Sequence, residues 1–352
     1  MAAPTEGVMA TAAESYMEAV QAASVEALAR AGCVERHLEL GGASIHCRFA
    51  GSALLPSVEP ALQHRIAQAS RSVDLTITIW DEASTSVGLP RSDGRVGCLV
   101  RGHLPALSDE GIDCAYEQNY GGLFMLRAAT KQAFFFAPDA PLPTYERAFP
   151  LRTILGWYLA RRGVQLVHSG AVGTGDAAVL LTGKGGSGKS NTTLACVEAG
   201  MSYFGDDYVG VSEDGEAPGV HGIFRSAKVF AGDEVSFPRL GAAAALGDSI
   251  GDTKSLFFLD PAVWPLERTK RIKAILLPRV AHRAKTEWQP AAAMDALKAI
   301  SFSTLAQRPA SNQCELSAMA RLARRVPSYW LHLGTDRREV AATVRRFMED
   351  TP

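Results

Sequence analysis

The sequence lacks paired cysteines, an excess of either charge, and long hydrophobic runs. None of its six cysteines forms a C-x-x-C pair, which argues against a zinc site or a disulfide framework and favours reduced thiols. The 36 basic and 37 acidic residues leave no basic field that would attract nucleic acid or an anionic membrane. Because no segment resembles a membrane span or a signal peptide, we expect a cytoplasmic protein.

The chain is long and apolar enough to form more than one domain, since 47% of its 352 residues are hydrophobic. Residues 1–32 predict an N-terminal helical arm, whose helix runs from Ala10 to Ala31 and ends at Gly32. Residues 33–143 predict a β-rich domain, and "APDAPLPT" predicts a linker with a boundary near Pro143.

The β-rich part is predicted from three stretches in which apolar and polar residues alternate. The first, "HLELGGASIHCRF", indicates a hairpin that turns at Gly41 and Gly42. The second, "SVDLTITIW", indicates a strand, and the third, "GGLFMLRAATKQAFFFAPD", indicates another hairpin. Such a module can recognise a peptide, because sheet edges accept extended chains.

Residues 144–352 predict an α/β domain that opens with "YERAFPLRTILGWYLARRG", in which apolar residues recur at helical spacing before Gly163, namely Leu151, Ile154, Leu155, Tyr158 and Leu159. Two strands then surround the turn "GTGD", and a turn centred on Thr174 and Gly175 pairs His168 with Leu181. This register places His168 beside the start of the next loop, and the antiparallel pairing predicts a mixed sheet. The predicted fold class is therefore α/β, with this C-terminal domain preceded by a smaller β-rich (α+β) domain.

The segment "GKGGSGKS" fits the phosphate-loop pattern G-x-x-x-x-G-K-[ST], between the strand "AAVLL" and the helical run "NTTLACVEA". Its backbone N–H groups can surround a nucleotide phosphate at a helix N-terminus. Lys189 can neutralise the β- and γ-phosphates, and the Ser190 hydroxyl can bind Mg²⁺. We therefore expect ATP and Mg²⁺ as ligands; the alternative is a glycine-rich turn that binds nothing. The expected nucleotide-binding residues are Gly183, Gly185, Gly186, Ser187, Gly188, Lys189, Ser190 and Asn191.

Two adjacent acids follow the loop helix in "MSYFGDDYVGV". The carboxyl ends of neighbouring strands meet at one edge of an α/β sheet, so Asp206 and Asp207 should lie near the bound phosphates. One acid can hold Mg²⁺ while the other accepts the proton of an attacking hydroxyl. The alternative is a solvated turn with no function.

The sequence does not decide the roles of four further residues. His168 can bind phosphate, orient an acid or fill a polar gap, and the sequence favours none of these strongly. Arg225, Lys228 and Lys254 are candidates for contacts to phosphate or acceptor, although single cations more often lie at solvated surfaces.

Five segments occur in the order and spacing seen in HPr kinase-like proteins, in particular the branch found beside lasso-peptide biosynthesis genes. They are "VHSGAVG", "GKGGSGKS", "YFGDDYV", "FRSAKV" and "RIKAILLPRV", and the resemblance covers roughly Glu146 to Gly334. It implies that Lys189 and Ser190 bind ATP and metal, and that Asp207 acts as the base on a protein serine, with Asp206 as its acidic neighbour. The catalytic residues are then predicted to be Asp207, Lys189 and His168, and the metal ligands Ser190 and Asp206.

The chain also departs from HPr kinases proper. Asn191 stands where those enzymes often have glutamate, and the glycine-rich arginine segment that follows in them is missing, so HPr itself is not the expected substrate. The lasso-associated relatives phosphorylate a precursor peptide at its C-terminal serine side, which implies a peptide acceptor here. The alternatives are a nucleotide sensor or scaffold without phosphotransfer, and a small-molecule kinase. The sequence leaves the oligomeric state open.

Overall fold

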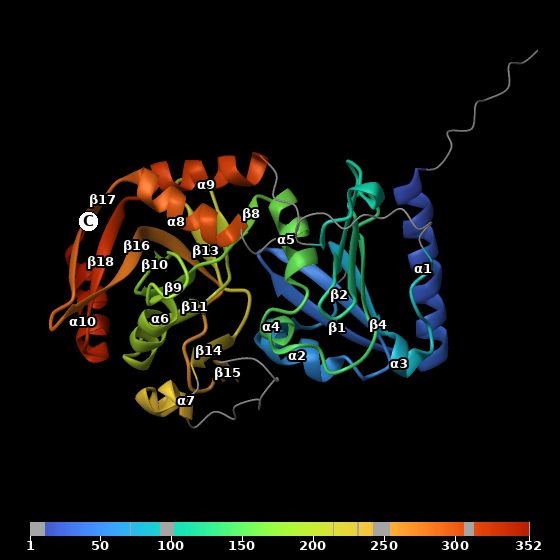
Figure 1. Cartoon of the computed structure of the whole chain (residues 1–352), viewed down its shortest axis with the longest axis horizontal. Helices are drawn as coiled ribbons and strands as arrows, with labels where there is room; N and C mark the ends of the chain where they lie inside the picture. The colour runs from blue at the N-terminus through green and yellow to red at the C-terminus, as the bar shows by residue number, and fades with distance from the viewer. Residues whose placement is uncertain are drawn as a thin grey trace, which may run out of the picture. The chain divides into compact units, whose positions relative to one another are not determined.

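The computed structural model describes residues 11–70, 72–91, 102–213, 215–230, 232–241, 254–305 and 313–351. The chain divides into two compact units (Figure 1). The first comprises Met1–His37, Ser44–Pro56 and Ala69–Leu142, and the second comprises Leu38–Ala43, Ser57–Gln68 and Pro143–Pro352. Two large sheets, each with parallel and antiparallel pairs, make this a mixed α/β protein. Within the described residues, no helix combines the length and the apolar character needed to cross a membrane.

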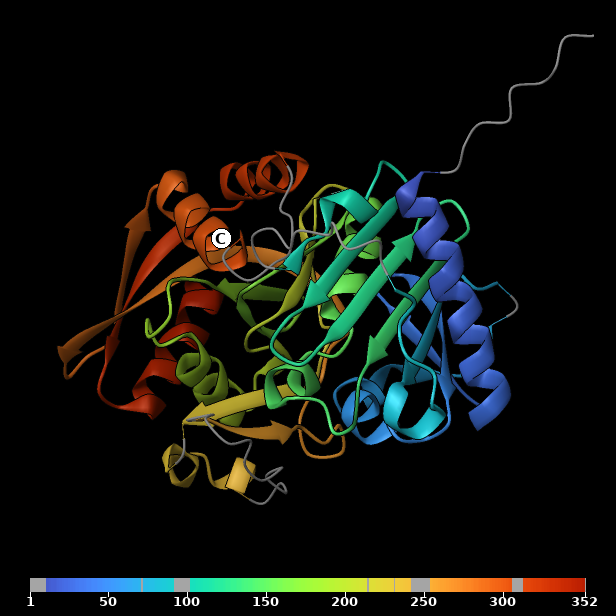
Figure 2. The ribbon, with the colours of Figure 1, turned by 45° about the vertical axis from the view of Figure 1, so that its right-hand side comes forward.

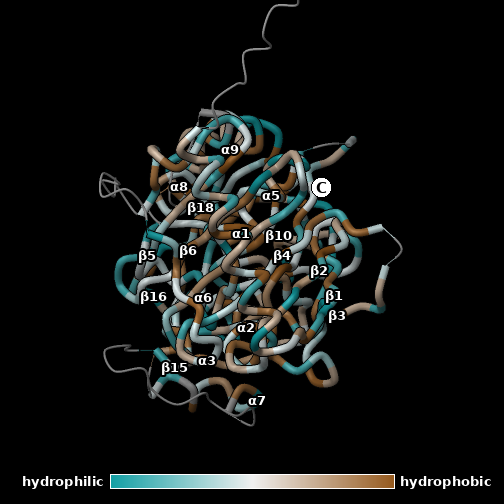
Figure 3. Tube along the Cα trace, turned by 90° about the vertical axis from the view of Figure 1, so that its right-hand side faces the viewer, coloured by the Kyte–Doolittle hydropathy of each residue, from teal (hydrophilic) through white to brown (hydrophobic). Residues whose placement is uncertain are grey.

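The first sheet has seven strands in the order β3-β1-β2-β4-β7-β6-β5. Its strands are β1 (Cys33–Leu40), β2 (Ala43–Ala50), β3 (Ile66–Ala67), β4 (Leu75–Asp81), β5 (Ile112–Glu117), β6 (Gly122–Arg127) and β7 (Gln132–Ala137). The hairpin at Gly41 and Gly42 is confirmed, with positive φ at both glycines, and so is the β6–β7 hairpin. Figure 3 shows β6 as hydrophobic along most of its length.

The helix α1 (Ala12–Ala31) runs along this sheet (Figure 2). It begins with a capping box between Thr11 and Glu14 and ends before Gly32, as the sequence predicts. Met17 on this helix shares one buried core with Trp80 and other residues of the sheet. Among the described residues before the second large sheet, the other helices are α2 (Leu55–Leu62), α3 (Glu82–Thr85), α4 (Thr144–Ala148), α5 (Arg152–Arg161) and the 3₁₀ turns η1 (Gln63–Arg65) and η3 (Pro105–Leu107).

The second sheet contains the phosphate-loop strand. Its strands are β8 (Val164–Val167), β9 (Gly170–Thr174), β10 (Ala177–Leu181), β11 (Ser202–Gly205), β12 (Val209–Ser212), β13 (Gly219–His221), β16 (Thr269–Arg283), β17 (Glu287–Ala291) and β18 (Ser328–Gly334). The main path runs β11-β9-β10-β16-β13-β12-β8, and β18 pairs with β16 and β17. A separate ribbon joins β14 (Ser226–Phe230) to β15 (Lys254–Phe258). The expected antiparallel strand beside the loop strand is confirmed as β9.

Helices cover both faces of this sheet (Figure 1). One face packs on α6 (Lys189–Glu198) and α10 (Arg337–Asp350), and the other packs on α8 (Ala293–Leu305) and α9 (Gln313–Arg325). The strand β10 is buried throughout. Val179 faces the core beneath α6 and α10, and Leu180 faces the core beneath α8 and α9. Such two-sided burial explains why "AAVLL" is a continuous apolar run. The small elements η4 (Asp233–Ser236) and α7 (Pro238–Gly241) complete the unit.

The structure overturns the predicted register of the "GTGD" hairpin. Its turn is Gly175–Asp176, with φ +58° at Gly175, so that Leu181 pairs with Gly170 and the predicted pairing with His168 is wrong. A positive φ at the first turn position favours glycine there, which selects the observed turn. His168 instead follows β8, a separate strand that pairs with β12.

The helix predicted from the apolar spacing of Leu151 to Leu159 is confirmed as α5, and a separate short helix, α4, precedes it. Pro150 lies between them, and proline disfavours helical backbone at the residue before it. Leu151 then takes a left-handed conformation, with φ +59°, before α5 begins. The apolar face predicted for α5 is buried, since Ile154 and Leu155 are fully buried.

Candidate active site

The phosphate loop joins the end of β10 to the start of α6, as the sequence predicts. Gly188 has φ +98°, and a Cβ there would lie 2.4 Å from Leu333 Cδ1. A Cβ at Gly183 would lie 2.8 Å from Ser187 Oγ, whereas one at Gly185 or Gly186 would meet no atom within 4 Å. The positive φ of Gly188 therefore favours glycine there, and a side chain at Gly183 would displace Ser187; the loop between them has free space beside its backbone.

Lys189 is buried at the start of α6, and its Nζ donates to the carbonyl oxygens of Gly183 at 2.8 Å and Lys184 at 3.3 Å. Burial lowers the pKa of Lys189, and the charge of Asp207 opposes that shift. An ammonium group placed inside the loop suits the phosphate chain of a nucleotide. Ser190 and Asn191 lie half-buried in the first turn of α6, where their roles stay predictions.

Buried hydroxyl groups without hydrogen-bond partners surround this loop. They are Ser169 Oγ, Thr182 Oγ1, Ser187 Oγ, Thr192 Oγ1 and Thr193 Oγ1. Buried polar atoms usually have partners, and a group of hydroxyl donors of this kind suits a ligand rich in oxygen. The residues present therefore fit a phosphate chain with its metal ion. Ser169 and the three threonines were not predicted, although Thr182 directly precedes the phosphate loop and "HSG" and "NTT" flank the predicted motifs.

The two acids lie at the same sheet edge as the loop. Since β10 and β11 each pair antiparallel with β9, they run parallel to one another and end on one side. Gly170 sits where the acid turn meets α6, because a Cβ there would lie 2.4 Å from Thr193 Oγ1 and 3.3 Å from the carbonyl oxygen of Asp206. The expected approach of the acids to the loop helix is therefore present in the structure.

Asp206 is fully buried. Its Oδ2 accepts a hydrogen bond of 3.1 Å from the backbone N–H of Lys228, and its Oδ1 has no hydrogen-bond partner. Burial, followed by the charge of Asp207, raises the pKa of Asp206 to about 7. A buried carboxylate with one unpaired oxygen can bind a divalent cation, which would supply the missing positive charge.

Asp207 is held between two nitrogen groups. Its Oδ1 lies 3.3 Å from His168 Nε2, and its Oδ2 lies 3.0 Å from Lys228 Nζ. Burial raises the pKa of Asp207, but the hydrogen bond from His168 and the charge of Lys228 outweigh it and hold this pKa well below its usual range. Burial alone would lower the pKa of Lys228, but the charges of Asp207 and Asp206 raise this pKa above its usual value. The site thus contains an ionised Asp207–Lys228 pair.

The structure brings His168 and Lys228 into the site by contacts that the sequence did not specify. Lys254 lies close enough to influence the pKa of both Lys189 and Asp206. Arg225 has a structural role instead: its guanidinium donates to the carbonyl oxygens of Pro60 at 2.6 Å and Leu259 at 3.2 Å. Two aromatic rings also line the cluster. The Tyr208 ring lies 5.3 Å from that of His168, and the Phe149 ring lies 4.8 Å from Lys228 Nζ.

Asp206→Asn should stabilise the ligand-free protein at high pH and have little effect at low pH. The folded-state pKa of Asp206 is raised above the usual 3.8 to about 7, so its ionisation opposes folding as the pH rises between those values. The amide stays neutral throughout. The free energy of unfolding should therefore match that of the parent near pH ~4 and exceed it above pH ~7. Thermal unfolding without Mg²⁺ measures this difference, and a difference that is constant with pH would contradict the raised pKa.

No protein-family model matches the chain, and no curated protein matches it by sequence. Among solved structures, the chain is similar to the HPr(Ser) kinase/phosphatase from Coxiella burnetii, with 10% identity and a TM-score of 0.28. The similarity covers 53% of this chain and 99% of that one. A TM-score this low supports no conclusion about function, which therefore has to be argued from the residues of the site.

Proposed function

We propose that this chain is an ATP-dependent serine kinase of the HPr kinase-like type, whose acceptor is a peptide. The observation that carries the proposal is the placement of two buried acids, one ionised and one with an unpaired oxygen, beside a phosphate loop. A nucleotide sensor needs the loop alone. The acids add what a transfer reaction needs, namely a metal ligand and a group that orients a hydroxyl.

In this proposal, the loop N–H groups and Lys189 bind the β- and γ-phosphates of ATP. Ser190 and Asp206 would hold Mg²⁺, which would neutralise charge on the phosphate oxygens. Lys228 and His168 fix Asp207 in one orientation, so that its carboxylate can accept a hydrogen bond from the acceptor hydroxyl. A carboxylate oxygen has two lone pairs, which leaves acceptor capacity on both oxygens despite their present partners.

The transfer step forms one bond and breaks another. The acceptor oxygen attacks the γ-phosphorus, the bond from that phosphorus to the bridging oxygen breaks, and ADP leaves. The hydroxyl proton passes to Asp207. The low pKa of Asp207 makes it a weak base. In a loose transition state the hydroxyl needs positioning more than early deprotonation, so a weak but fixed carboxylate suits the reaction.

The acceptor that we propose is a serine near the C-terminus of a peptide, as in lasso-peptide precursors. A flexible peptide end can bring a serine hydroxyl to a site at the ends of the strands. The seven-stranded first sheet exceeds what a minimal small-molecule kinase needs. Extended peptides can add to such sheets at an edge strand.

The expected result is phosphorylation of a peptide that ends in Ser and not of the same peptide ending in Ala. The enzyme is incubated with ATP, Mg²⁺ and either peptide, and mass spectrometry follows the gain of one phosphate. Gain on the Ser peptide alone supports the proposal. Transfer to a small alcohol but to no peptide would identify a small-molecule kinase, and ATP binding without any transfer would identify a sensor.

A further inference from the structure

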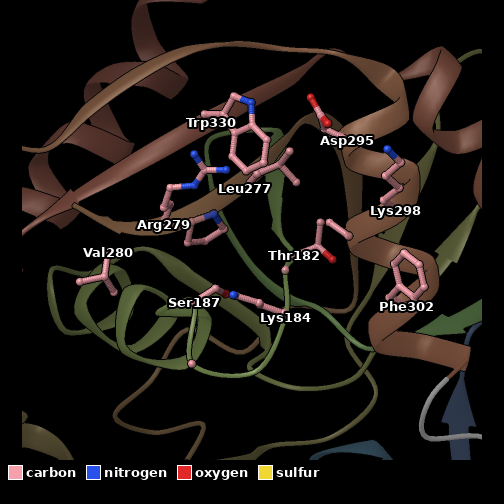
Figure 4. A pocket seen from close by; sticks show the side chains of 14 residues that line it. Thr182, Lys184, Ser187, Leu277, Arg279, Val280, Asp295, Lys298, Phe302 and Trp330 are labelled. Carbon is pink, nitrogen blue, oxygen red and sulfur yellow. The ribbon is translucent and has the colours of Figure 1, made fainter.

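A cavity of about 630 Å³ lies on the side of the phosphate loop that faces α8 (Figure 4). The loop forms one wall through Thr182, Gly183 and Ser187. The strands β16 and β18 form a second wall with Arg279 and Trp330, and α8 forms a third. The volume is typical of a pocket for one small molecule.

The side chains of Arg279 and Trp330 form a flat stacked surface in this cavity. The Arg279 Cζ lies 4.1 Å from the centroid of the Trp330 ring. Trp330 pairs with Leu277 in the parallel register of β16 and β18, and Arg279 lies two residues further along β16. Residues two apart on a strand share a face, so this arrangement follows from the strand register.

The helix α8 contributes an exposed aromatic ring to the same cavity. Phe302 is 76% exposed, although a large apolar side chain normally gains by burial. Figure 4 shows Phe302 and Lys298 on α8, opposite the loop residues Ser187 and Lys184. The cavity therefore combines aromatic surfaces with cationic groups directly beside the proposed phosphate site.

The strand order gives the direction of the bound nucleotide. On one side of β10 in the sheet lie β9 and then β11, which the two acids follow in the sequence. On the other side of β10 lie β16 and then β18. The γ-phosphate must face Asp206 and Asp207 for transfer. The α-phosphate and the nucleoside then extend away from the acids, toward the ends of β16 and β18, where the cavity lies.

We infer that this cavity binds the nucleoside part of the nucleotide, with the purine base stacked on the Trp330–Arg279 surface and against Phe302. This inference rests on the proposed function, since it places the rest of the same nucleotide. A base stacks on aromatic and guanidinium planes, and each such stack is worth enough to change affinity by about 10- to 100-fold. Trp330 is thus an affinity-determining residue for the nucleoside and has no part in phosphate binding.

Two ligands separate base recognition from phosphate recognition: ATP and inorganic triphosphate, each with Mg²⁺. Isothermal titration with Trp330→Ala should show about 10- to 100-fold weaker binding of ATP and unchanged binding of triphosphate. Trp330→Phe should restore most of the ATP affinity. Phe302→Ser should also weaken binding of ATP and leave binding of triphosphate unchanged. Because the Phe302 side chain is exposed, this variant should fold, and it provides the test if Trp330→Ala does not fold. Met294→Ser is the matched control, since Met294 is a 56% exposed side chain on α8 that does not line the cavity.

Unchanged ATP affinity in a folded Trp330→Ala protein would overturn the inference, and so would equal losses for ATP and triphosphate. Neither result touches the proposed function as long as the parent still binds triphosphate and transfers phosphate. Failure of the parent to bind either ligand would instead refute the phosphate site itself.

Discussion

Replacing Lys189 by methionine should reduce phosphoryl transfer by about 10³-fold or more, because a cation that neutralises the transferring phosphate contributes on that scale. Lys189 Nζ lies inside the loop, against the carbonyl oxygens of Gly183 and Lys184, whereas the other loop lysine, Lys184, is exposed. Methionine keeps the apolar stem and removes only the ammonium group. ATP affinity should fall as well, because the same charge binds the ground-state phosphates.

The measurements are the rate of ADP formation in the presence of acceptor and isothermal titration with ATP and Mg²⁺. Lys285→Ala is the control, since Lys285 is an exposed lysine in the loop between β16 and β17. Burial lowers the pKa of Lys189, so the ammonium is costly in the ligand-free fold and its loss should not lower the melting temperature. A Lys189→Met protein that binds and turns over ATP like the parent would refute the phosphate-loop assignment.

Asp207→Asn should reduce transfer by about 10² to 10⁴, the usual contribution of a group that accepts the reacting proton. ATP binding should remain nearly intact, because the proposed metal ligand is Asp206. The variant also leaves the half-buried Lys228 without its carboxylate partner, and breaking a buried ion pair costs up to about 3–5 kcal/mol of stability. A loss of activity alone would therefore not separate catalysis from folding.

The double variant Asp207→Asn with Lys228→Met makes this separation. It removes both charges, so stability should recover while transfer stays low. Asp176→Asn is the control, since the Asp176 side chain is 81% exposed in the hairpin turn between β9 and β10. Recovery of transfer together with stability in the double variant would assign Asp207 a structural role, and mild, equal effects of Asp206→Asn and Asp207→Asn would exclude both acids from the transfer step.

The local patterns predicted the loop and its flanking elements well, for physical reasons. Gly188 has a positive φ that favours glycine, a Cβ at Gly183 would crowd Ser187, and the apolar run before them is a strand buried on both faces. The approach of Asp206 to α6 was also predictable, because parallel strands end at one sheet edge. These features depend on short sequence distances and on general rules of sheet geometry.

Other features of the site depend on long-range pairing, which local patterns do not encode. Only Asp206, Asp207 and Tyr208 separate β11 from β12, yet these strands lie near opposite ends of the sheet path. The strand β8, which carries His168 at its end, pairs with β12 and not with β10. His168 therefore reaches Asp207 by a route that the predicted hairpin register did not contain.

The ion pair of Lys228 with Asp207 is a second example. Lys228 lies on the ribbon β14–β15, and "FRSAKVF" has the same pattern as many solvated strand ends. Only the fold shows that Lys228 is half-buried and paired with Asp207, while Arg225, three residues earlier, donates hydrogen bonds to backbone carbonyl oxygens. Sequence spacing treats the two cations alike, and packing distinguishes them.

The central claim is that this site transfers the γ-phosphoryl group of ATP, and ³¹P NMR tests it most directly because it follows every phosphorus species at once. With ATP, Mg²⁺ and the Ser-ended peptide, the parent should convert the ATP signals into ADP and a phosphomonoester, with little inorganic phosphate. Asp207→Asn should leave the ATP signals shifted by binding but unconverted over the same time. ATP that binds to the parent and persists unchanged with the peptide, or that yields only inorganic phosphate, would contradict the account.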